Sequence, residues 1–374
     1  MTQFSPLDAQ LMAKAIRLAE KGQFTTSPNP NVGCVLADAN GHIVGQGWHQ
    51  RAGTAHAEMH ALAQAGDKAR GATAYVTLEP CSHTGRTAPC ADALIQAGVS
   101  KVIAAMVDPN PLVAGAGLAR LAGAGIKVAH GLMQQQAETL NRGFVKRMST
   151  GMPWVTVKLA SSLDGKTALA NGQSQWITAP QARQDVQRHR AKSCAILSGS
   201  GTVLADDPSL NVRYRETGLS EDILAQKDLR QPLRIILDGR NQLHSRLKLL
   251  SLAGDVLLIN SQFNTQAFPA QVSQWQAPYE NKQLDLPQVF KHLGSLQINH
   301  IWVEAGAKLA GALLQNSLID ELILYQAPKL LGDLGQNMFA IDELTSMQQA
   351  YKLAWQDIRQ LGCDIKLTAL LEYP

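Results

Sequence analysis

Three side chains that can share one metal ion constrain the fold of this chain more than any other sequence feature. They are His56, Cys81 and Cys90. One imidazole and two thiolates bind zinc and leave its fourth tetrahedral position for a water molecule, which the metal acidifies. We therefore expect these three side chains to lie close together in the folded protein.

Glu58 stands two residues after the first of these ligands. From that position its carboxylate can carry a proton from the activated water to a departing amine. Zinc-dependent base deaminases carry the pattern H-x-E followed by P-C-x-x-C, with the glutamate outside the metal shell. Here eight residues separate Cys81 from Cys90 instead of two, so the match to that general pattern is incomplete.

A closed structural zinc site is the alternative to a catalytic one, and simple burial of the cysteines is another. Coordination by His60, one helical turn after His56, would favour a closed site. Local packing of His60 would instead leave the fourth position open. Cys34 follows Gly33 in an apolar segment, which predicts that it belongs to the core.

The composition describes an ordinary globular protein. The 374 residues, with 45% hydrophobic and 17% charged, suggest two or three domains with buried cores. A net charge of +4 suits an anionic small molecule but is too weak for a nucleic-acid footprint. Five scattered cysteines indicate a reducing environment. No apolar run reaches the roughly 18 residues of a membrane span, and no signal-peptide layout is present. We expect a cytoplasmic protein that binds neither nucleic acid nor membrane.

Helical and strand patterns alternate through the first 146 residues, which predicts a three-layer α/β arrangement. The predicted helices are 5–21, 56–65, 89–96 and 134–146, and the predicted strands are 32–36, 43–48, 73–78, 102–106 and 126–129. Residues 147–153 contain turn residues and end in proline, so we expect the linker there.

The second half alternates in the same way. Its predicted strands are 154–160, 195–197, 234–237, 256–259, 301–303 and 322–325, with a helix over 180–191. The stretch 260–284 is rich in Gln, Asn and Pro, and we expect it to form a surface excursion.

A nucleotide site is only weakly indicated in this half. G-x-G-x-x-G is absent, so the usual dinucleotide fingerprint is missing. Residues 301–312 form an apolar strand, a turn of small residues and a helix, which leaves backbone N–H groups free for a phosphate. An ordinary strand–helix junction would look the same.

Motifs from both halves together resemble bacterial riboflavin-specific deaminase-reductases. The resemblance covers essentially the whole chain, and the long loop between the cysteines separates it from cytidine and tRNA adenosine deaminases. The segments that carry it are 29–33, 56–58, 79–87 with Cys90, 108–117, 158–166, 174–178 and 201–208.

The resemblance implies two domains and two reactions. Residues 1–148 would form a cytidine-deaminase-like domain and residues 149–374 a dihydrofolate-reductase-like α/β domain. The first would use zinc to deaminate 2,5-diamino-6-(5-phosphoribosylamino)pyrimidin-4-one. The second would use NADPH to reduce the ribosyl side chain, giving 5-amino-6-(5-phosphoribitylamino)uracil. The family usually forms homo-oligomers.

The resemblance also implies roles for individual residues. Glu58 would act in deamination, and Lys158 and Glu304 would assist hydride transfer. The deaminase substrate would contact Asn29, His83, Arg86, Thr87, Asp108 and Asn110. The reductase substrate would contact Ser174, Arg190, Leu210, Arg213 and Glu304. The cofactor would contact Ala160, Trp176, Thr202, Asp206, Gly306, Ala307, Lys308, Leu309, Ala310, Gly311 and Ala312.

Several of these residues have simpler explanations. Asn29 and Asp108 stand beside prolines and could serve only to form turns. Lys158 could be a lysine at the end of a strand with its charge in solvent, and Arg190 could lie on a solvated helix face. NADPH differs from NADH by one extra phosphate, and no segment of the sequence clearly indicates a binding pocket for it.

Two other functions remain open at this stage. One is a nucleic-acid base deaminase with an RNA-binding C-terminal half. The long loop, the aromatic content of 5% and the lack of a basic, aromatic stripe argue against it. The other is a scaffold that zinc stabilises without catalysis.

Overall fold

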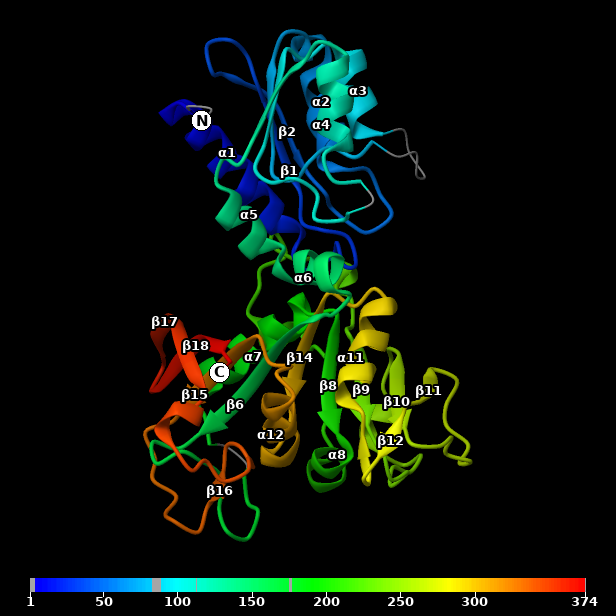
Figure 1. Ribbon diagram of the computed structural model, residues 1–374, viewed down its shortest axis with the longest axis vertical. Coiled ribbons are helices and arrows are strands. Elements are labelled where there is room, and N and C mark those ends of the chain that lie inside the picture. Colours follow the sequence, from blue (N-terminus) through cyan, green and yellow to red (C-terminus); the bar gives the residue numbers. More distant parts are fainter. Residues whose placement is uncertain (1–3, 83–88, 112, 175–176, 374) are drawn as a thin grey trace. The chain divides into compact units, whose positions relative to one another are not determined.

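The computed structural model describes residues 4–82, 89–111, 113–174 and 177–373. The chain forms two compact units, Met1–Gly151 and Met152–Pro374 (Figure 1). The predicted linker at 147–153 is shorter than expected, because helix α6 (Arg142–Thr150) continues through its first four residues. The helix ends at Gly151, whose φ of 74° is a conformation that glycine adopts without strain.

The first unit is built on a sheet of five strands in the order β2-β1-β3-β4-β5. β1 is antiparallel to both of its neighbours, whereas β3, β4 and β5 are parallel. The strands are β1 Gly33–Ala37, β2 Ile43–Trp48, β3 Thr73–Val76, β4 Lys101–Ala104 and β5 Lys127–His130. The remaining elements are α1 Pro6–Ala19, α2 Ala57–Ala65, α3 Cys90–Ala97, α4 Ala116–Gly123, α5 Gln134–Leu140, η1 Glu20–Gly22 and η2 Gly66–Ala69.

Helices cover both faces of this sheet. One core joins it to α2, α3 and α4, and a second joins its other face to α1 and α5. The predicted three-layer α/β arrangement is therefore confirmed. The predicted start of the first helix is also confirmed, since the Ser5 side chain accepts from the Asp8 backbone N–H at 3.1 Å and Asp8 returns the bond.

The single helix predicted over 134–146 is wrong. The structure has two helices, α5 and α6, which meet at Asn141. The Asn141 side chain is buried and bonds the backbone of Asn31, accepting from its N–H at 2.7 Å and donating to its carbonyl at 2.9 Å. This tertiary contact fixes Asn141 in a non-helical conformation, and nothing in the local sequence indicates it.

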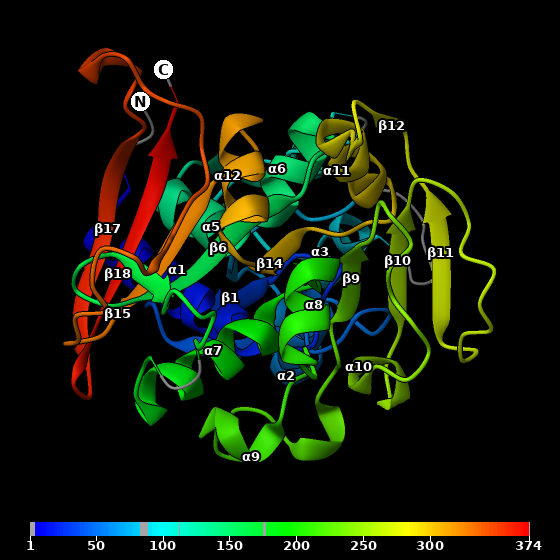
Figure 2. The ribbon, with the colours of Figure 1, turned by 90° about the horizontal axis from the view of Figure 1, so that it is seen from below.

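The second unit contains a sheet of nine strands in the order β11-β10-β9-β8-β14-β6-β15-β18-β17 (Figure 2). The strands from β11 to β15 are parallel, and β18 and β17 are antiparallel additions at one edge. Their bounds are β6 Trp154–Ser161, β8 Ala195–Gly199, β9 Leu233–Leu237, β10 Val256–Asn260, β11 Val272–Gln276, β14 His300–Glu304, β15 Glu321–Gln326, β17 Lys352–Leu361 and β18 Asp364–Glu372.

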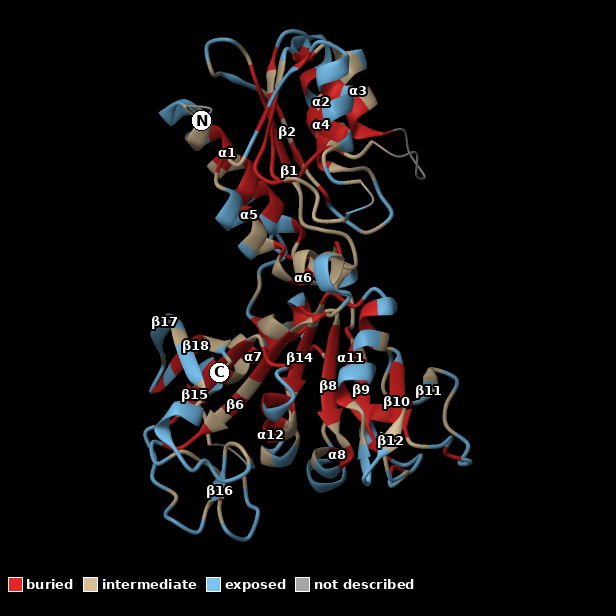
Figure 3. Ribbon diagram, viewed as in Figure 1, coloured by how far each residue is buried: buried red, intermediate tan, exposed pale blue. Residues whose placement is uncertain are grey.

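Helices again cover both faces. α11 and α12 pack into one core, and α7 and α10 pack into the other. Figure 3 shows that the central strands are buried and that the helices expose their outer sides. The helices are α7 Pro180–Lys192, α8 Ser200–Asp206, α9 Tyr214–Thr217, α10 Lys248–Ser251, α11 Leu286–Ser295, α12 Ala307–Gln315, η3 Gln226–Asp228 and η4 Met347–Gln349. Within the described ranges, no helix is both long and apolar enough to cross a membrane.

The stretch 260–284 has more structure than the sequence predicted. It contributes β11, which extends the sheet beside β10, and the short hairpin of β12 and β13. The short strands of this unit are β7 Lys166–Ala168, β12 Tyr279–Glu280, β13 Gln283–Leu284 and β16 Gln336–Asn337. Since β9, β8, β14 and β6 are parallel, their carboxyl ends share one edge of the sheet, where ligands bind in folds of this type.

The close contact of β1 with α1 yields a prediction about stability. A Cβ on Gly33 would lie 2.0 Å from the backbone oxygen of Ala15. We expect Gly33→Ala to lower the free energy of unfolding of the first unit by about 1–3 kcal/mol, because strand and helix would have to separate. Urea unfolding followed by circular dichroism measures this. Gly123→Ala is the matched control, since among the described residues its Cβ position meets nothing within 4 Å apart from its chain neighbours and its own helix backbone. Equal effects of both variants would contradict the prediction.

Candidate active sites

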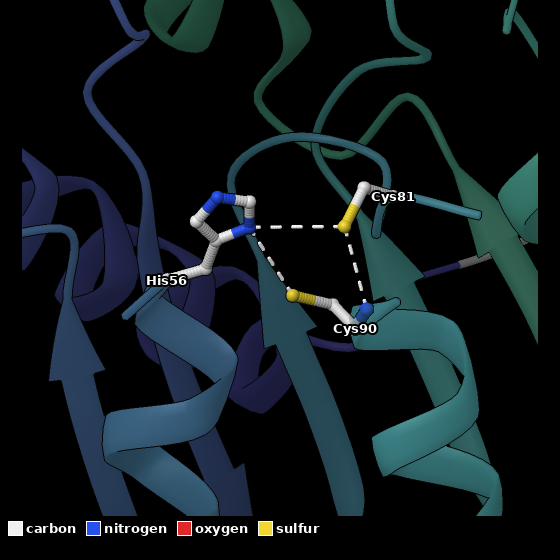
Figure 4. Close-up of side chains that lie close together, drawn as sticks. All are labelled: His56, Cys81 and Cys90. Atoms are coloured by element: carbon white, nitrogen blue, oxygen red, sulfur yellow. Dashed lines mark hydrogen bonds between the residues drawn. The ribbon is translucent and has the colours of Figure 1, made fainter. Parts of the chain in front are cut away.

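The predicted zinc ligands meet at the ends of three segments in the first unit (Figure 4). His56 is the N-cap residue of α2, Cys90 is the first residue of α3, and Cys81 follows β3 after a short connection. The His56 Nδ1 atom lies 3.7 Å from the Cys81 Sγ atom and 3.3 Å from the Cys90 Sγ atom. All three atoms lie within 4.8 Å of one another.

These separations fit zinc. Tetrahedral bonds of about 2.0 Å to nitrogen and 2.3 Å to sulfur place the two ligand atoms roughly 3.5 Å apart. Hydrogen bonds from Cys90 and His56 hold the pKa of the Cys81 thiol well below its ordinary value, which favours the thiolate that a metal requires. Among the described residues, no fourth His, Cys or acidic side chain belongs to this group.

Glu58 lies next to the ligands, in the first turn of α2. Its side chain is buried, and its Oε2 atom has no hydrogen-bond partner among the described residues. Burial raises the pKa of Glu58 to about 7. A carboxyl group with such a pKa can both accept and donate a proton near neutral pH.

Two further residues considered for the zinc site, His60 and Cys34, lie outside the ligand group. The Nε2 atom of His60 is buried without a partner among the described residues, and this side chain is not in the ligand group. His60 instead packs in α2 against β2, where a Cβ on Gly47 would lie 2.5 Å from the His60 Cβ. Cys34 lies in the core as predicted, and burial raises the pKa of its thiol.

Asn29 is oriented by a histidine that the sequence did not single out. His49 is buried, and its ring lies edge-on to the ring of His56, with centroids 5.4 Å apart. Its Nδ1 atom donates to the carbonyl of Ala55 at 3.1 Å, so its Nε2 atom accepts from Asn29 Nδ2 at 3.1 Å. Burial lowers the pKa of His49, which favours this neutral form. The Oδ1 atom of Asn29 remains as an acceptor.

Glu79 organises the loop that follows β4, another role that the sequence did not indicate. Its carboxylate accepts four backbone N–H groups at 2.8–3.2 Å, from Asp108, Gly115, Gly117 and Leu118. A Cβ on Gly117 would lie 1.9 Å from the carbonyl oxygen of Pro80, so the loop packs directly against the segment that carries Cys81. The motif Glu79-Pro80-Cys81 therefore joins a metal ligand to the predicted substrate loop.

The other predicted residues of the first unit are less well defined. Asp108 Oδ1 accepts from the backbone N–H of Asn110 at 2.9 Å, which is the turn that the sequence offered as the simpler explanation. Contact of either residue with a substrate remains a prediction. Three further substrate contacts implied by the resemblance lie outside the described residues; they are His83, Arg86 and Thr87.

The second unit contains a cavity of ≈ 1360 Å³ along the carboxyl edge of its sheet. Most of the described cofactor and substrate candidates line it: Lys158, Ala160, Ser174, Thr202, Asp206, Leu210, Glu304, Gly306, Ala307, Lys308, Leu309 and Ala312. This volume exceeds what one drug-sized ligand usually needs, so it suits a dinucleotide together with a second molecule. Trp176 lies outside the described residues.

Four predicted residues do not line this cavity. Ala310 and Gly311 face the interior of the unit, and a Cβ on Gly311 would lie 1.9 Å from the carbonyl oxygen of Ala340. The sequence could not distinguish the inner from the outer side of this turn of α12. Arg213 is paired with Glu216 at the surface.

Arg190 is the fourth predicted residue that does not line the cavity. It forms a buried ion pair with Glu304. Its Nε and one terminal nitrogen donate to the two oxygens of Glu304 at 2.6 and 2.8 Å, and its other terminal nitrogen donates to the carbonyl of Asn211 at 2.9 Å. It is only 8% exposed, so the alternative of a solvated helix face is wrong. These bonds use three of the five N–H donors of the guanidinium. Arg190 thereby positions Glu304, which also accepts from Trp302 Nε1 at 2.9 Å.

The Arg190–Glu304 pair and burial in the unit shift the pKa values of two groups that line the cavity, Glu304 and Lys158. Burial alone would raise the pKa of Glu304, but the guanidinium of Arg190 holds it down at about 2. Burial lowers the pKa of Lys158, which makes its ammonium a readier proton donor. Lys158 is partly buried in β6 and lines the cavity. Arg183, one residue of the cavity that the sequence missed, lies seven residues before Arg190 on the same side of α7.

Comparisons with known proteins find a family match in each unit. The family model of the cytidine and deoxycytidylate deaminase zinc-binding region matches residues 5–106, and that of the RibD C-terminal domain matches residues 153–367. The chain is 53% identical to riboflavin biosynthesis protein RibD of Escherichia coli K12 over 361 residues, covering 96% of this chain and 98% of that one. It is 53% identical to the Haemophilus influenzae protein of the same name over 370 residues, covering 98% of each.

Solved structures show the same arrangement of elements. Acinetobacter baumannii RibD is 45% identical with a TM-score of 0.89, and the match covers 98% of this chain and 99% of that one. A Thermotoga maritima diaminohydroxyphosphoribosylaminopyrimidine deaminase/5-amino-6-(5-phosphoribosylamino)uracil reductase is 30% identical with a TM-score of 0.85. That match covers 97% of this chain and 98% of the other.

Glu79 provides the first prediction from these sites. In Glu79→Gln an amide –NH2 would face backbone N–H groups and could not accept from them. We expect the first unit to lose roughly 1.5–3 kcal/mol of stability and the KM for deamination to rise, because the 108–118 loop would loosen. Steady-state kinetics and zinc analysis check this. Asp92→Asn, at an exposed pair with Arg120, is the matched control. Loss of zinc with an unchanged KM would contradict a role in the loop.

The ion pair of Arg190 with Glu304 provides the second prediction from these sites. We expect Arg190→Met to lower the free energy of unfolding of the second unit by about 3–5 kcal/mol, since it leaves the Glu304 carboxylate buried without its partner. Arg213→Met, which removes an exposed pair, should cost no more than about 1 kcal/mol. Urea titrations followed by tryptophan fluorescence compare the two variants. Similar losses would show that the Arg190–Glu304 pair is effectively solvated.

Proposed function

Because this chain belongs to the RibD family of riboflavin biosynthesis proteins, which join a deaminase to a reductase, we propose that its two units act consecutively on one pyrimidine. The chain is a bifunctional enzyme that uses zinc and NADPH. We propose that residues 1–148 deaminate 2,5-diamino-6-(5-phosphoribosylamino)pyrimidin-4-one and release ammonia. Residues 149–374 then reduce the ribosyl group to ribityl, giving 5-amino-6-(5-phosphoribitylamino)uracil. The name of the Thermotoga maritima relative supports this substrate pair.

The observation that carries the proposal is the presence of a complete set of chemical groups in each unit. The first unit holds the three candidate zinc ligands with Glu58 beside them. The second holds Lys158 and Glu304 on one cavity. By resemblance to the family, we further propose that the enzyme is a cytoplasmic homo-oligomer.

In deamination, His56, Cys81 and Cys90 would hold the metal, which when bound acidifies a water molecule. Glu58 would take the proton of the attacking water and pass it to the amino group that leaves as ammonia, and its pKa of about 7 suits both steps. Asn29, held by His49, would accept a hydrogen bond from the pyrimidine through its free Oδ1 atom. The buried setting keeps the proton within the site.

In reduction, NADPH when bound supplies the hydride. Conversion of ribosyl to ribityl breaks the bond between C1′ and the ring oxygen, with a hydride added at C1′ and a proton at that oxygen. We propose that Lys158, which lines the cavity, supplies this proton, and its lowered pKa would assist the transfer. Glu304, held as a carboxylate by Arg190, would accept hydrogen bonds from the sugar hydroxyls.

Separate active sites predict separable defects. We expect Glu58→Ala to reduce ammonia release by about 10²–10⁴-fold or more while reduction of the deaminated intermediate continues, because a proton shuttle is lost in one unit only. Lys158→Ala should have the opposite effect. One assay that follows both ammonia and NADPH measures the two reactions.

Zinc removal supplies the control for this pair of variants. Chelation should stop NADPH consumption from the diaminopyrimidine but not from added deaminated intermediate. Loss of both activities in well-folded Glu58→Ala would contradict the assignment of one reaction to each unit.

A further inference from the structure

Two cations line one end of the large cavity and have no role in the reaction as described. Arg240 lies in the loop after β9, three residues beyond its end at Leu237, and Lys282 lies in the turn between β12 and β13. Both side chains are exposed. Within the part of the chain that the structure describes, neither side chain makes a hydrogen bond or an ion pair. Their charges are therefore available to a ligand in the cavity.

The order of the strands separates this end from the reacting groups. Lys158 belongs to β6 and Glu304 to the adjacent β14, while β9 lies beyond β8 on the other side. Neighbouring strands are about 4.8 Å apart, so the end of β9 is roughly 14 Å from the end of β6. A nicotinamide ring that donates its hydride beside Lys158 leaves the rest of the dinucleotide to extend past β14 and β8 toward β9.

The middle of this path suits the shared part of both nicotinamide cofactors. Gly306 and the first turn of α12 line the cavity between the two ends, and Thr202 bonds the backbone N–H of Gly306 at 3.3 Å. A pyrophosphate is favoured at such a helix start. The adenosine end of the cofactor then falls near β9, where Arg240 and Lys282 lie.

The hairpin that carries Lys282 is held against the loop after β9. A Cβ on Gly239 would lie 3.0 Å from Tyr279 Cε2 and 3.1 Å from Leu284 Cγ, so glycine permits this close approach. Gly239, Tyr279 and Leu284 also line the cavity. The stretch 260–284 therefore contributes to the cavity wall, although its sequence suggested only a surface excursion.

The backbone conformation at Lys282 does not require a lysine and would favour glycine. Asn281 and Lys282 form a two-residue turn with φ values of 51° and 63°. Turns of this kind favour Asn followed by Gly, because glycine adopts positive φ without strain. Compared with glycine at this position, lysine has a strained backbone conformation but places a positive charge at the cavity.

We propose that Arg240 and Lys282 bind the 2′-phosphate of NADPH and so determine the preference for NADPH over NADH. This inference rests on the proposed function, since it requires the cavity to hold the cofactor with its nicotinamide near Lys158. An arginine fork and a lysine ammonium both bind phosphate through charge-assisted hydrogen bonds. NADH lacks this phosphate, so the two cations add nothing to its binding.

The test is equilibrium binding of cofactors to the full-length protein without substrate. Arg240→Gln, Lys282→Gln and the double variant are titrated with NADPH and with NADH, following the fluorescence of the reduced nicotinamide. We expect NADPH to bind the double variant about 10- to 100-fold more weakly, with the affinity for NADH unchanged. Adenosine 2′,5′-bisphosphate should lose affinity in parallel, whereas adenosine 5′-monophosphate should not.

Arg246→Gln is the matched control, since Arg246 is an exposed arginine on the same connection that does not line the cavity. It should bind both cofactors like the parent protein. Equal weakening of NADPH and NADH in the double variant would overturn the inference, because the cations would then bind a shared part of the cofactor. Unchanged NADPH binding would also overturn it. A parent protein that binds neither cofactor would refute the proposed reductase function itself.

Discussion

The zinc ligand set depends on contacts that keep three chain segments together. A metal needs its ligands within fixed bond lengths, and here they come from the start of α2, the start of α3 and the connection after β3. The sheet positions these starts, and Glu79 ties the connection to the 108–118 loop through four backbone N–H groups. The same arrangement places the buried Glu58 beside the candidate ligands, so one set of contacts positions both the ligand group and the carboxylate proposed to move the proton.

The second unit holds charged groups, Glu304 and Lys158, in a partly buried cavity. An isolated buried carboxylate is costly, and the two-pronged pairing of Arg190 with Glu304 offsets that cost. The pair keeps Glu304 ionised next to Lys158, whose own pKa burial lowers. A carboxylate and an amine whose pKa values are both shifted, lining one cavity, are typical of active sites. Arg190 therefore holds Glu304 in place, and contact of Arg190 with a substrate remains a prediction.

Local patterns predicted the parts of this protein that depend on neighbouring residues. The α/β alternation and the helix start at Ser5 follow from residue type and spacing, and the structure confirms them. The structure also brings the ligand atoms of the three predicted zinc ligands within 4.8 Å of one another. The hairpin of β17 and β18 was missed, although alternating residues on both sides of Gly362 could have indicated it. The unbroken helix over 134–146 was wrong, because the contact that divides it comes from Asn31, more than a hundred residues away.

The sequence by itself determined which chemistry this protein can perform, since zinc requires particular ligand types and the proton shuttle requires a carboxylate beside them. The family resemblance placed the reductase on the same chain. Only the tertiary structure decided which candidates face a ligand. It turned Ala310 and Gly311 inward, paired Arg190 with Glu304, and brought Arg183, Arg240 and Lys282 onto the cavity. These outcomes depend on strand order and on packing between distant segments, which the spacing of residues along the chain does not encode.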